Sequence, residues 1–110
     1  LLDVNAAAGQ ALVSKLGERA SFIETDVTSE PAVNAAIAAA SQAMGGINVA
    51  VNCAGVGWPK RMVGKDGPMP GDFFRKVIEI NLVGTLLVCR PPRPRCRRTR
   101  PTWTASGARS

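Results

Sequence analysis

The chain has 110 residues, of which 45% are hydrophobic, and its formal net charge is +6. This length suits one small domain, and no apolar run approaches the roughly 20 residues that a helix needs to cross a bilayer. Three cysteines occur without any histidine and without a C-x-x-C pair, which argues against zinc and against a disulfide framework. We therefore expect a cytoplasmic protein with reduced thiols, no metal and no contact with a membrane.

The charge is distributed unevenly along the chain. Residues 1–89 contain seven Lys or Arg and all eight Asp and Glu, whereas residues 90–110 contain seven Arg and no acid. The first part is therefore close to neutral, and the positive charge belongs to the last part. We expect a folded domain over residues 1–89 and a disordered, Arg- and Pro-rich tail over residues 90–110.

The first half of the chain alternates helical and strand-like segments. Between residues 5 and 17, apolar side chains recur every four residues and a glycine follows, which predicts a short helix. Residues 21–25 alternate weakly, as a strand does, and residues 26–31 supply a turn, a hydroxyl cap, a Glu and a Pro suited to a helix start. A second helix should follow, with an apolar face made by Val33, Ile37, Ala40 and Met44.

The second half continues the alternation. Residues 47–51 form a mostly apolar, β-branched run, which predicts a parallel strand buried on both faces. Residues 57–71 hold four Gly and three Pro, which predicts a long and functional loop. Asp72 should cap a third helix that is apolar around much of its circumference, and hence mostly buried, and that stops at Pro91. Alternating strands and helices favour an α/β fold with a parallel sheet.

Asn-Cys-Ala-Gly at residues 52–55 directly follows the predicted buried strand. In an α/β sheet, ligands bind outside the carboxyl ends of the strands, where small residues let the backbone approach a cofactor. Asn52, Ala54 and Gly55 therefore suit a nucleotide site. An ordinary turn at the end of a strand explains the same residues equally well.

Three further features support a site at this edge. Asp26 and Val27 end the preceding strand, where a carboxylate could accept a hydrogen bond from an adenine amino group; the alternative is that Asp26 begins a helix cap. Asp3 also lies at the end of a strand, where an acid can bind ribose hydroxyls and repel a 2′-phosphate. The alternative is that Asp3 caps a helix. Asn81 and Gly84 lie in a helix that is predicted to be buried. A buried polar group needs a hydrogen-bond partner, and Gly lowers the stability of a helix by about 1 kcal/mol relative to Ala. These two residues therefore suggest close packing or a site.

The motifs Asp-Val-Thr at 26–28, Asn-Cys-Ala-Gly at 52–55 and Asn-Leu-Val-Gly-Thr at 81–85, in this order and spacing, resemble those of the short-chain dehydrogenase/reductase family. The resemblance covers residues 1–89, and within the family it is strongest to type-2 3-hydroxyacyl-CoA dehydrogenases. The implied fold is a partial Rossmann-type doubly wound parallel sheet, its βαβαβα portion, with the first strand and the C-terminal half missing.

The resemblance also implies roles for single residues. The residues that would bind NAD are Asp3 at the adenosine ribose, Asp26 and Val27 at the adenine, and Asn52, Ala54 and Gly55 along the cofactor. Asp3 would favour NAD over NADP. Asn81 matches the family's active-site Asn, which keeps a helix bulged and holds a water in a proton relay.

Other parts of the family's active site have no counterpart in this sequence. The glycine-rich phosphate loop would precede residue 1, and the catalytic Ser and the Tyr-x-x-x-Lys motif would follow residue 89, while the chain contains no Tyr at all. We therefore expect an inactive internal piece of an NAD-dependent oxidoreductase. Its parent would oxidise a small-molecule secondary alcohol, such as a 3-hydroxyacyl-CoA, to a ketone, and would form a homotetramer as this family usually does.

A missing first strand has a structural consequence. In the doubly wound order 3-2-1-4-5-6 the first strand lies at the centre of the sheet. Residues 21–25 and 47–51 would then lack the strand that bridges them. We expect open strand edges and a poorly soluble or partly disordered product.

Two explanations account for the tail. An evolved Arg-rich arm would bind phosphate backbones, which makes a small basic nucleic-acid-binding protein the alternative function. A shifted reading frame is the explanation that the abrupt change of composition at Arg90 favours. If GC-rich codons are read from their third base, residue 91 onward becomes Ala-Ala-Glu-Ala-Ala-Met, which extends the preceding helix with good helix formers. A third hypothesis is an interaction module that joins intact relatives through residues 72–89.

Overall fold

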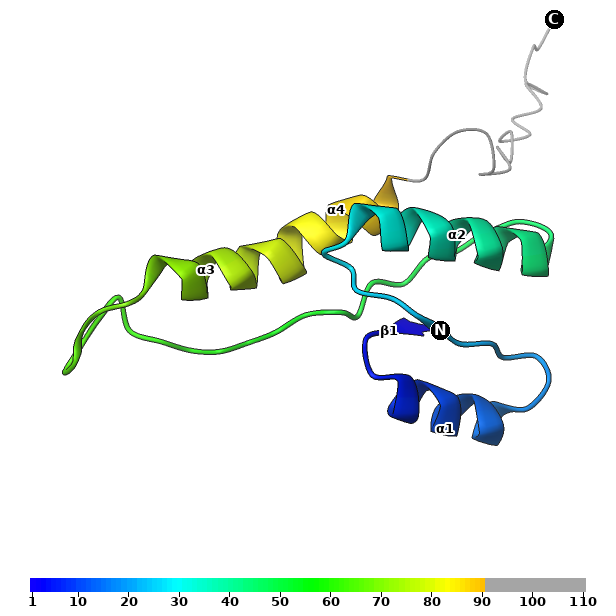
Figure 1. The fold of residues 1–110 in the computed structure, drawn as a ribbon, viewed down its shortest axis with the longest axis horizontal. Helices are drawn as coiled ribbons and strands as arrows, with labels where there is room; N and C mark the ends of the chain where they lie inside the picture. Colours follow the sequence, from blue (N-terminus) through cyan, green and yellow to red (C-terminus); the bar gives the residue numbers. More distant parts are fainter. Residues whose placement is uncertain (91–110) are drawn as a thin grey trace, which may run out of the picture.

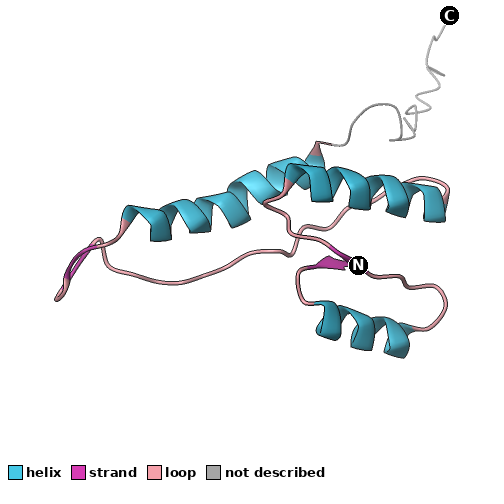
Figure 2. Ribbon diagram, in the orientation of Figure 1, coloured by secondary structure: helices cyan, strands magenta, loops and turns pink. Residues whose placement is uncertain are grey.

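The computed structural model describes residues 1–90, and the predicted tail beyond Arg90 lies outside the described residues. Figures 1 and 2 show short strands between helices, followed by one long helix with a wider turn in its middle. In chain order the elements are β1 (Leu2–Asp3), α1 (Ala6–Leu16), β2 (Ile23–Glu24), α2 (Glu30–Met44), β3 (Val63–Gly64), β4 (Gly67–Pro68), α3 (Gly71–Ile78), the π-helix η1 (Glu79–Val83) and α4 (Gly84–Cys89).

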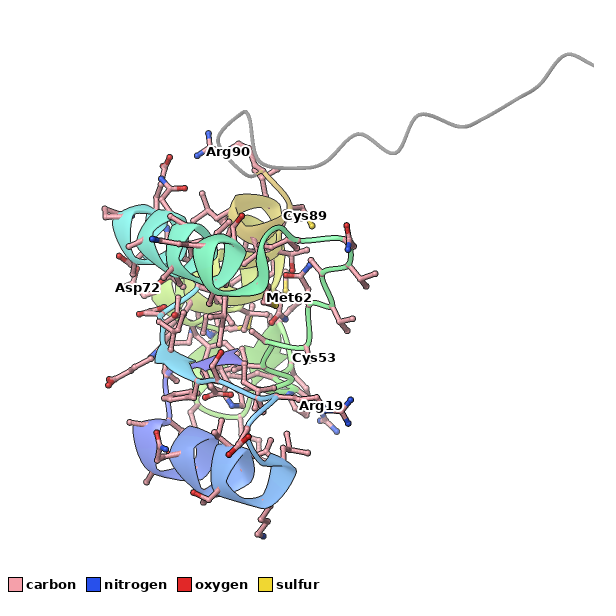
Figure 3. All side chains as sticks on the ribbon, turned by 90° about the vertical axis from the view of Figure 1, so that its right-hand side faces the viewer. Arg19, Cys53, Met62, Asp72, Cys89 and Arg90 are labelled. Atoms are coloured by element: carbon pink, nitrogen blue, oxygen red, sulfur yellow. The ribbon has the colours of Figure 1, made fainter. Side chains whose placement is uncertain are left out.

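The strands β1 and β2 form the centre of a three-layer arrangement. They pair in parallel, with Leu2 opposite Ile23 and Asp3 opposite Glu24, and α1 connects them. In Figures 1 and 3, α1 lies on one side of the strands, and α2 and α4 lie together on the other. Helices on both faces of a parallel pair define the predicted α/β fold, which the structure confirms.

Side-chain caps start α1 and α2, and a glycine ends α2. The side chain of Asn5 accepts a hydrogen bond from the Ala8 N–H at 3.0 Å and starts α1, and Ser29 Oγ accepts one from the Ala32 N–H at 3.4 Å and starts α2. Gly45 ends α2 with φ +69°, a left-handed conformation that glycine adopts without steric cost. None of the helices within residues 1–90 is long and apolar enough to cross a membrane.

The core lies between α2 and α4. Val33 and Ala36 of α2 and Leu87 of α4 are buried. Thr25, directly after β2, is also buried, and its hydroxyl donates to the Ile23 carbonyl at 3.1 Å. Gly84 at the start of α4 is also buried, because the helix passes close to the turn that follows β2. The close packing that the sequence suggested at this glycine is therefore present.

Replacing Gly84 tests this close approach. A Cβ at this position would stand 2.7 Å from Val27 Cγ2, so α4 would have to move away from the turn. Overpacking of this kind costs about 1–3 kcal/mol, which exceeds the roughly 0.5–1 kcal/mol that Ala adds to a helix. We expect Gly84→Ala to lower the free energy of unfolding in urea by about 1 kcal/mol net.

The control for this substitution is Gly71→Ala. A Cβ at Gly71 meets no atom within 4 Å, so this variant should keep or slightly raise the stability of the helix. Equal unfolding free energies for the two variants would contradict the packing role of Gly84.

The predicted strand at residues 47–51 is not formed. The segment is extended without a ladder, and Val49 and Val51 are each 78% exposed. A parallel strand is buried only when neighbouring strands and covering helices surround it, and within residues 1–90 no strand lies beside this one. The prediction of a buried strand is therefore wrong, because residues 47–51 have no neighbouring strand in the described part of the chain.

The long helix and the loop before it also depart from expectation. Phe74 and Leu82 are 53% and 63% exposed, so the helix is not mostly buried; α2 covers only its last part, α4. Asp72 does not cap it: the helix begins at Gly71, and Asp72 pairs with Arg75 at 2.7 Å. The loop at 57–71 contains the antiparallel hairpin β3–β4, which turns at Lys65 and Asp66; Gly67, with φ +107°, begins β4 opposite Gly64.

Candidate functional site

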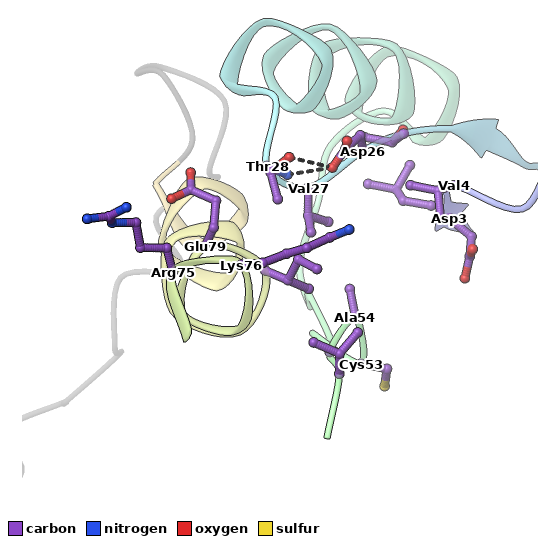
Figure 4. Close-up of a pocket in the computed structure, with 15 residues that line it drawn as sticks. Asp3, Val4, Asp26, Val27, Thr28, Cys53, Ala54, Arg75, Lys76 and Glu79 are labelled. Carbon is purple, nitrogen blue, oxygen red and sulfur yellow. Dashed lines mark hydrogen bonds between the residues drawn. The ribbon is translucent and has the colours of Figure 1, made fainter. Parts of the chain in front are cut away.

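The carboxyl ends of the two strands and the segment after residue 52 open on one cleft. Its volume is about 630 Å³, and it is lined by residues 2–4, 25–28 and 53–56 together with one side of the long helix. Asp3, Asp26, Val27, Ala54 and Gly55 therefore share a single cleft, as Figure 4 shows for those that it labels. Asn52 and Asn81 do not line it.

Asp26 is held by the turn that follows β2. Its Oδ1 accepts hydrogen bonds from the Thr28 N–H at 2.9 Å and from the Thr28 hydroxyl at 2.8 Å (Figure 4). These two bonds, the backbone one foremost, lower the pKa of the exposed Asp26 carboxyl. Ser29, not Asp26, caps α2, so Asp26 presents a fixed negative charge to the cleft.

The pH dependence of this turn follows from the lowered pKa. A carboxyl whose pKa is lower in the folded state stabilises the fold above its ordinary pKa and loses that contribution as the pH falls through the lowered value. In Thr28→Val the hydroxyl donor is gone, so we expect the pKa of Asp26 to rise toward its ordinary value. Carboxyl NMR titration of Asp26 measures this.

Thr85→Val serves as the matched control, because the Thr85 hydroxyl donates to the Asn81 carbonyl at 2.7 Å within the long helix. This variant should leave the titration of Asp26 unchanged. An unaltered Asp26 pKa in Thr28→Val would show that the hydroxyl does not hold the carboxylate.

Asp3 occupies a second turn at the same edge. Its Oδ1 accepts a hydrogen bond from the Asn5 N–H at 2.9 Å, and Asn5 in turn caps α1. Asp3 therefore orders the turn before α1 without capping the helix itself. Asp3 is the last residue of β1 and lines the cleft.

Asn81 holds the segment 53–56, which lines the cleft, although Asn81 itself does not line it. Its Oδ1 accepts from the Val56 N–H at 2.8 Å, and its Nδ2 donates to the Val56 carbonyl at 2.8 Å. A Cβ on Gly55 would stand 3.1 Å from the same Oδ1, so glycine allows the two segments to meet. The wider turn of η1, closed by the Gly84 N–H on the Glu79 carbonyl, surrounds Asn81.

The position of Asn52 differs from that of its neighbours. Its Nδ2 donates to Cys89 Sγ at 3.4 Å, which ties the extended segment to the end of α4 and keeps the amide outside the cleft lining. Cys53 and Cys89 are both free and exposed. Within residues 1–90, no three His, Cys, Asp or Glu side chains gather in a way that could hold a metal ion.

Sequence reasoning missed the contribution of the long helix to the cleft. Arg75, Lys76 and Glu79 line it, and in Figure 4 the side chain of Lys76 extends from the helix into it. Their spacing of three and four residues places charges on one helix face, which is a detectable signal, although a charged face is usually a solvated one.

Asn81→Ala tests the attachment of residues 53–56. Loss of two hydrogen bonds, each contributing about 0.5–1.5 kcal/mol net, should lower the free energy of unfolding by about 1–2 kcal/mol. It should also release the Val56 backbone, so the amide hydrogen of Val56 should exchange faster. Asn48→Ala is the control, because Asn48 is exposed and takes part in neither bond; similar exchange at Val56 in both variants would refute this role of Asn81.

Comparison with known proteins places the chain in a family. Residues 1–104 match the family model described as enoyl-(acyl carrier protein) reductase. Type-2 3-hydroxyacyl-CoA dehydrogenases from Bos taurus and Homo sapiens are each 38% identical to it over 92 residues, which cover 82% of this chain. The chain belongs to the short-chain dehydrogenase/reductase family. The family model extends past residue 89, where the sequence motifs that carried the resemblance end.

Other members of the short-chain dehydrogenase/reductase family extend the comparison. The 3-beta-hydroxysteroid dehydrogenase of Comamonas testosteroni is 36% identical over 88 residues. The crystal structure of 3-ketoacyl-(acyl-carrier-protein) reductase from Brucella melitensis, complexed with NADH, superimposes with a TM-score of 0.72 at 25% identity over 81% of this chain. The expected partial Rossmann-type fold is thereby confirmed. The chain spans about a third, 35%, of the length of the type-2 dehydrogenases that it matches.

Proposed function

We propose that residues 1–89 form the part of an NAD-linked short-chain dehydrogenase that holds the adenosine half of the cofactor. The observation that carries this proposal is the shared cleft, which is lined by the acids Asp3 and Asp26 and by the small residues Ala54 and Gly55. NADH in the related Brucella melitensis reductase gives it further support.

The residues present fit such a cofactor. Both hydrogen bonds within the turn end on Asp26 Oδ1, so Oδ2 remains available to accept from an adenine amino group. Val27 beside it offers an apolar surface to the ring. Asp3 would accept from the ribose hydroxyls, and its negative charge would oppose the extra phosphate of NADP, which makes NAD the proposed cofactor.

The proposed reaction of the whole protein is oxidation of a secondary alcohol to a ketone, and the relatives named 3-hydroxyacyl-CoA dehydrogenase support a 3-hydroxyacyl thioester as the substrate. NAD, when bound, supplies the hydride acceptor. In that reaction Asn81 would position a water for proton transfer through its wider helical turn. This chain has no Tyr to donate or accept the proton, so the 110 residues alone are proposed to be inactive. NAD-linked alcohol oxidation by the purified chain would contradict this.

Binding of reduced cofactors tests the proposal. We expect the chain to bind NADH more tightly than NADPH, measured by the fluorescence of the dihydronicotinamide. Asp3→Asn keeps an oxygen that can accept from the Asn5 N–H but removes the charge, so it should reduce the preference for NADH about tenfold.

Asp66→Asn provides the matched control for charge. Asp66 is exposed in the turn between β3 and β4 and does not line the cleft, so this variant should retain the preference. Absence of NADH binding by the folded chain, or an equal change in both variants, would reject the assignment of Asp3.

A further inference from the structure

A cluster of two aromatic rings and two lysines lies beside the cleft. The rings of Trp58 and Phe73 have centroids 5.9 Å apart, Lys60 Nζ lies 5.3 Å from the centroid of Phe73, and Lys76 Nζ lies 5.8 Å from that of Trp58. Residues 58 and 60 come from the extended segment that leaves the cleft, and residues 73 and 76 come from α3. We call these four residues the aromatic–lysine cluster.

Within residues 1–90 neither lysine of the cluster forms an ion pair, and the acid that shares the cleft with Lys76 is Glu79, three residues further along the helix. In the part of the chain that the structure describes, the ion pairs are Arg75 with Asp72 and Arg90 with Glu30. Asp72, although it is next to Phe73, is thus engaged by Arg75, and Arg61 adds a further positive charge next to Lys60. The aromatic–lysine cluster therefore concentrates two lysine charges over one pair of neighbouring rings.

The rings make this concentration possible. A cation over an aromatic face gains about 0.5–1 kcal/mol at an exposed site, which offsets part of the repulsion between the two ammonium groups. Each ammonium has three N–H donors, and the ring satisfies none of them as a hydrogen-bond acceptor would. Two such groups held on one aromatic pair suit a compact anion of double charge, and a phosphate monoester has that charge at neutral pH.

The location of the cluster connects it to the proposed site. Lys76 both belongs to the cluster and extends into the cleft, whereas Trp58, Lys60 and Phe73 lie outside the cleft lining. A ligand in the cleft that reaches past Lys76 would place its far end on the cluster.

We infer that the aromatic–lysine cluster anchors the phosphate monoester of a ligand that enters the cleft alongside the cofactor. This inference rests on the proposed function, because it assigns to the substrate a phosphorylated end remote from the reacting carbon. The diphosphate of the cofactor is the other phosphate group that could reach the cluster, and the experiment separates the two.

The experiment uses Trp58 as the reporter. In a Trp103→Phe background Trp58 is the single Trp of the chain, so its indole N–H gives one NMR signal. Titration with glycerol 3-phosphate should shift this signal saturably, whereas glycerol should not, and added salt should weaken the binding. Lys60→Gln combined with Lys76→Gln should weaken it about tenfold, and each single substitution should weaken it less.

Removal of two positive charges elsewhere provides the control. Lys15→Gln combined with Arg19→Gln, at the end of α1, should leave the titration unchanged. No shift in the parent protein, or an equal loss of binding in both double variants, overturns the inference.

Repeating the titration with saturating NADH distinguishes the two sources of phosphate. A shift that persists supports a separate phosphorylated ligand, and a shift that NADH abolishes assigns the cluster to the cofactor and overturns the inference. If NADH itself fails to bind, the proposed function fails, while the titration without NADH still decides whether the cluster holds a phosphate monoester.

Discussion

The arrangement of the cleft depends on the pair of hydrogen bonds between Asn81 and the backbone of Val56. Residues 47–56 lack a neighbouring strand in the described part of the chain, so no sheet ladder fixes their position. The side-chain amide of Asn81 offers one donor and one acceptor, as a backbone peptide does, and engages both groups of Val56 at 2.8 Å. One side chain thus does for this segment what a neighbouring strand does elsewhere in a parallel sheet.

Two glycines allow the long helix to make these contacts. Gly55 leaves room for the Asn81 side chain, and Gly84 lets the start of α4 lie against Val27. The same helix therefore contacts the turn after β2 and the segment after residue 52, and it holds these two walls of the cleft at a fixed separation. Since protein interiors are densely packed, a shift of the helix would move both walls together.

Features that depend on local chemistry could be predicted from the sequence, and features that depend on distant neighbours could not. The helix starts at Asn5 and Ser29, and the ends at glycines, follow from capping chemistry alone. Burial of residues 47–51 requires flanking strands, and burial of the face that bears Leu82 requires a further packing layer, and neither surrounds these residues here. Composition and periodicity contain no information about such neighbours.

The candidate site divides in the same way. Small residues and acids at strand ends indicated the edge at which Asp3, Asp26 and Gly55 now share a cleft. The position of Lys76 in the cleft could not be predicted, because in the sequence it resembles any surface lysine of a helix. The hairpin at residues 63–68 was detectable, since an Asp-Gly pair is a strong turn signal, but the surrounding Gly and Pro suggested an irregular loop.

The π-helical turn at Glu79–Val83 has an evolutionary consequence. A turn of this kind accommodates one residue more than an α-helical turn, so a point substitution does not readily create or remove it, whereas an insertion or a deletion does. Deleting one residue there would restore a regular helix and keep the segments on either side nearly in phase, but it would remove the wider turn that surrounds Asn81. Side chains around the turn can therefore vary with little effect on the helix, whereas loss of one residue within it would change the backbone that sets Asn81 against Val56.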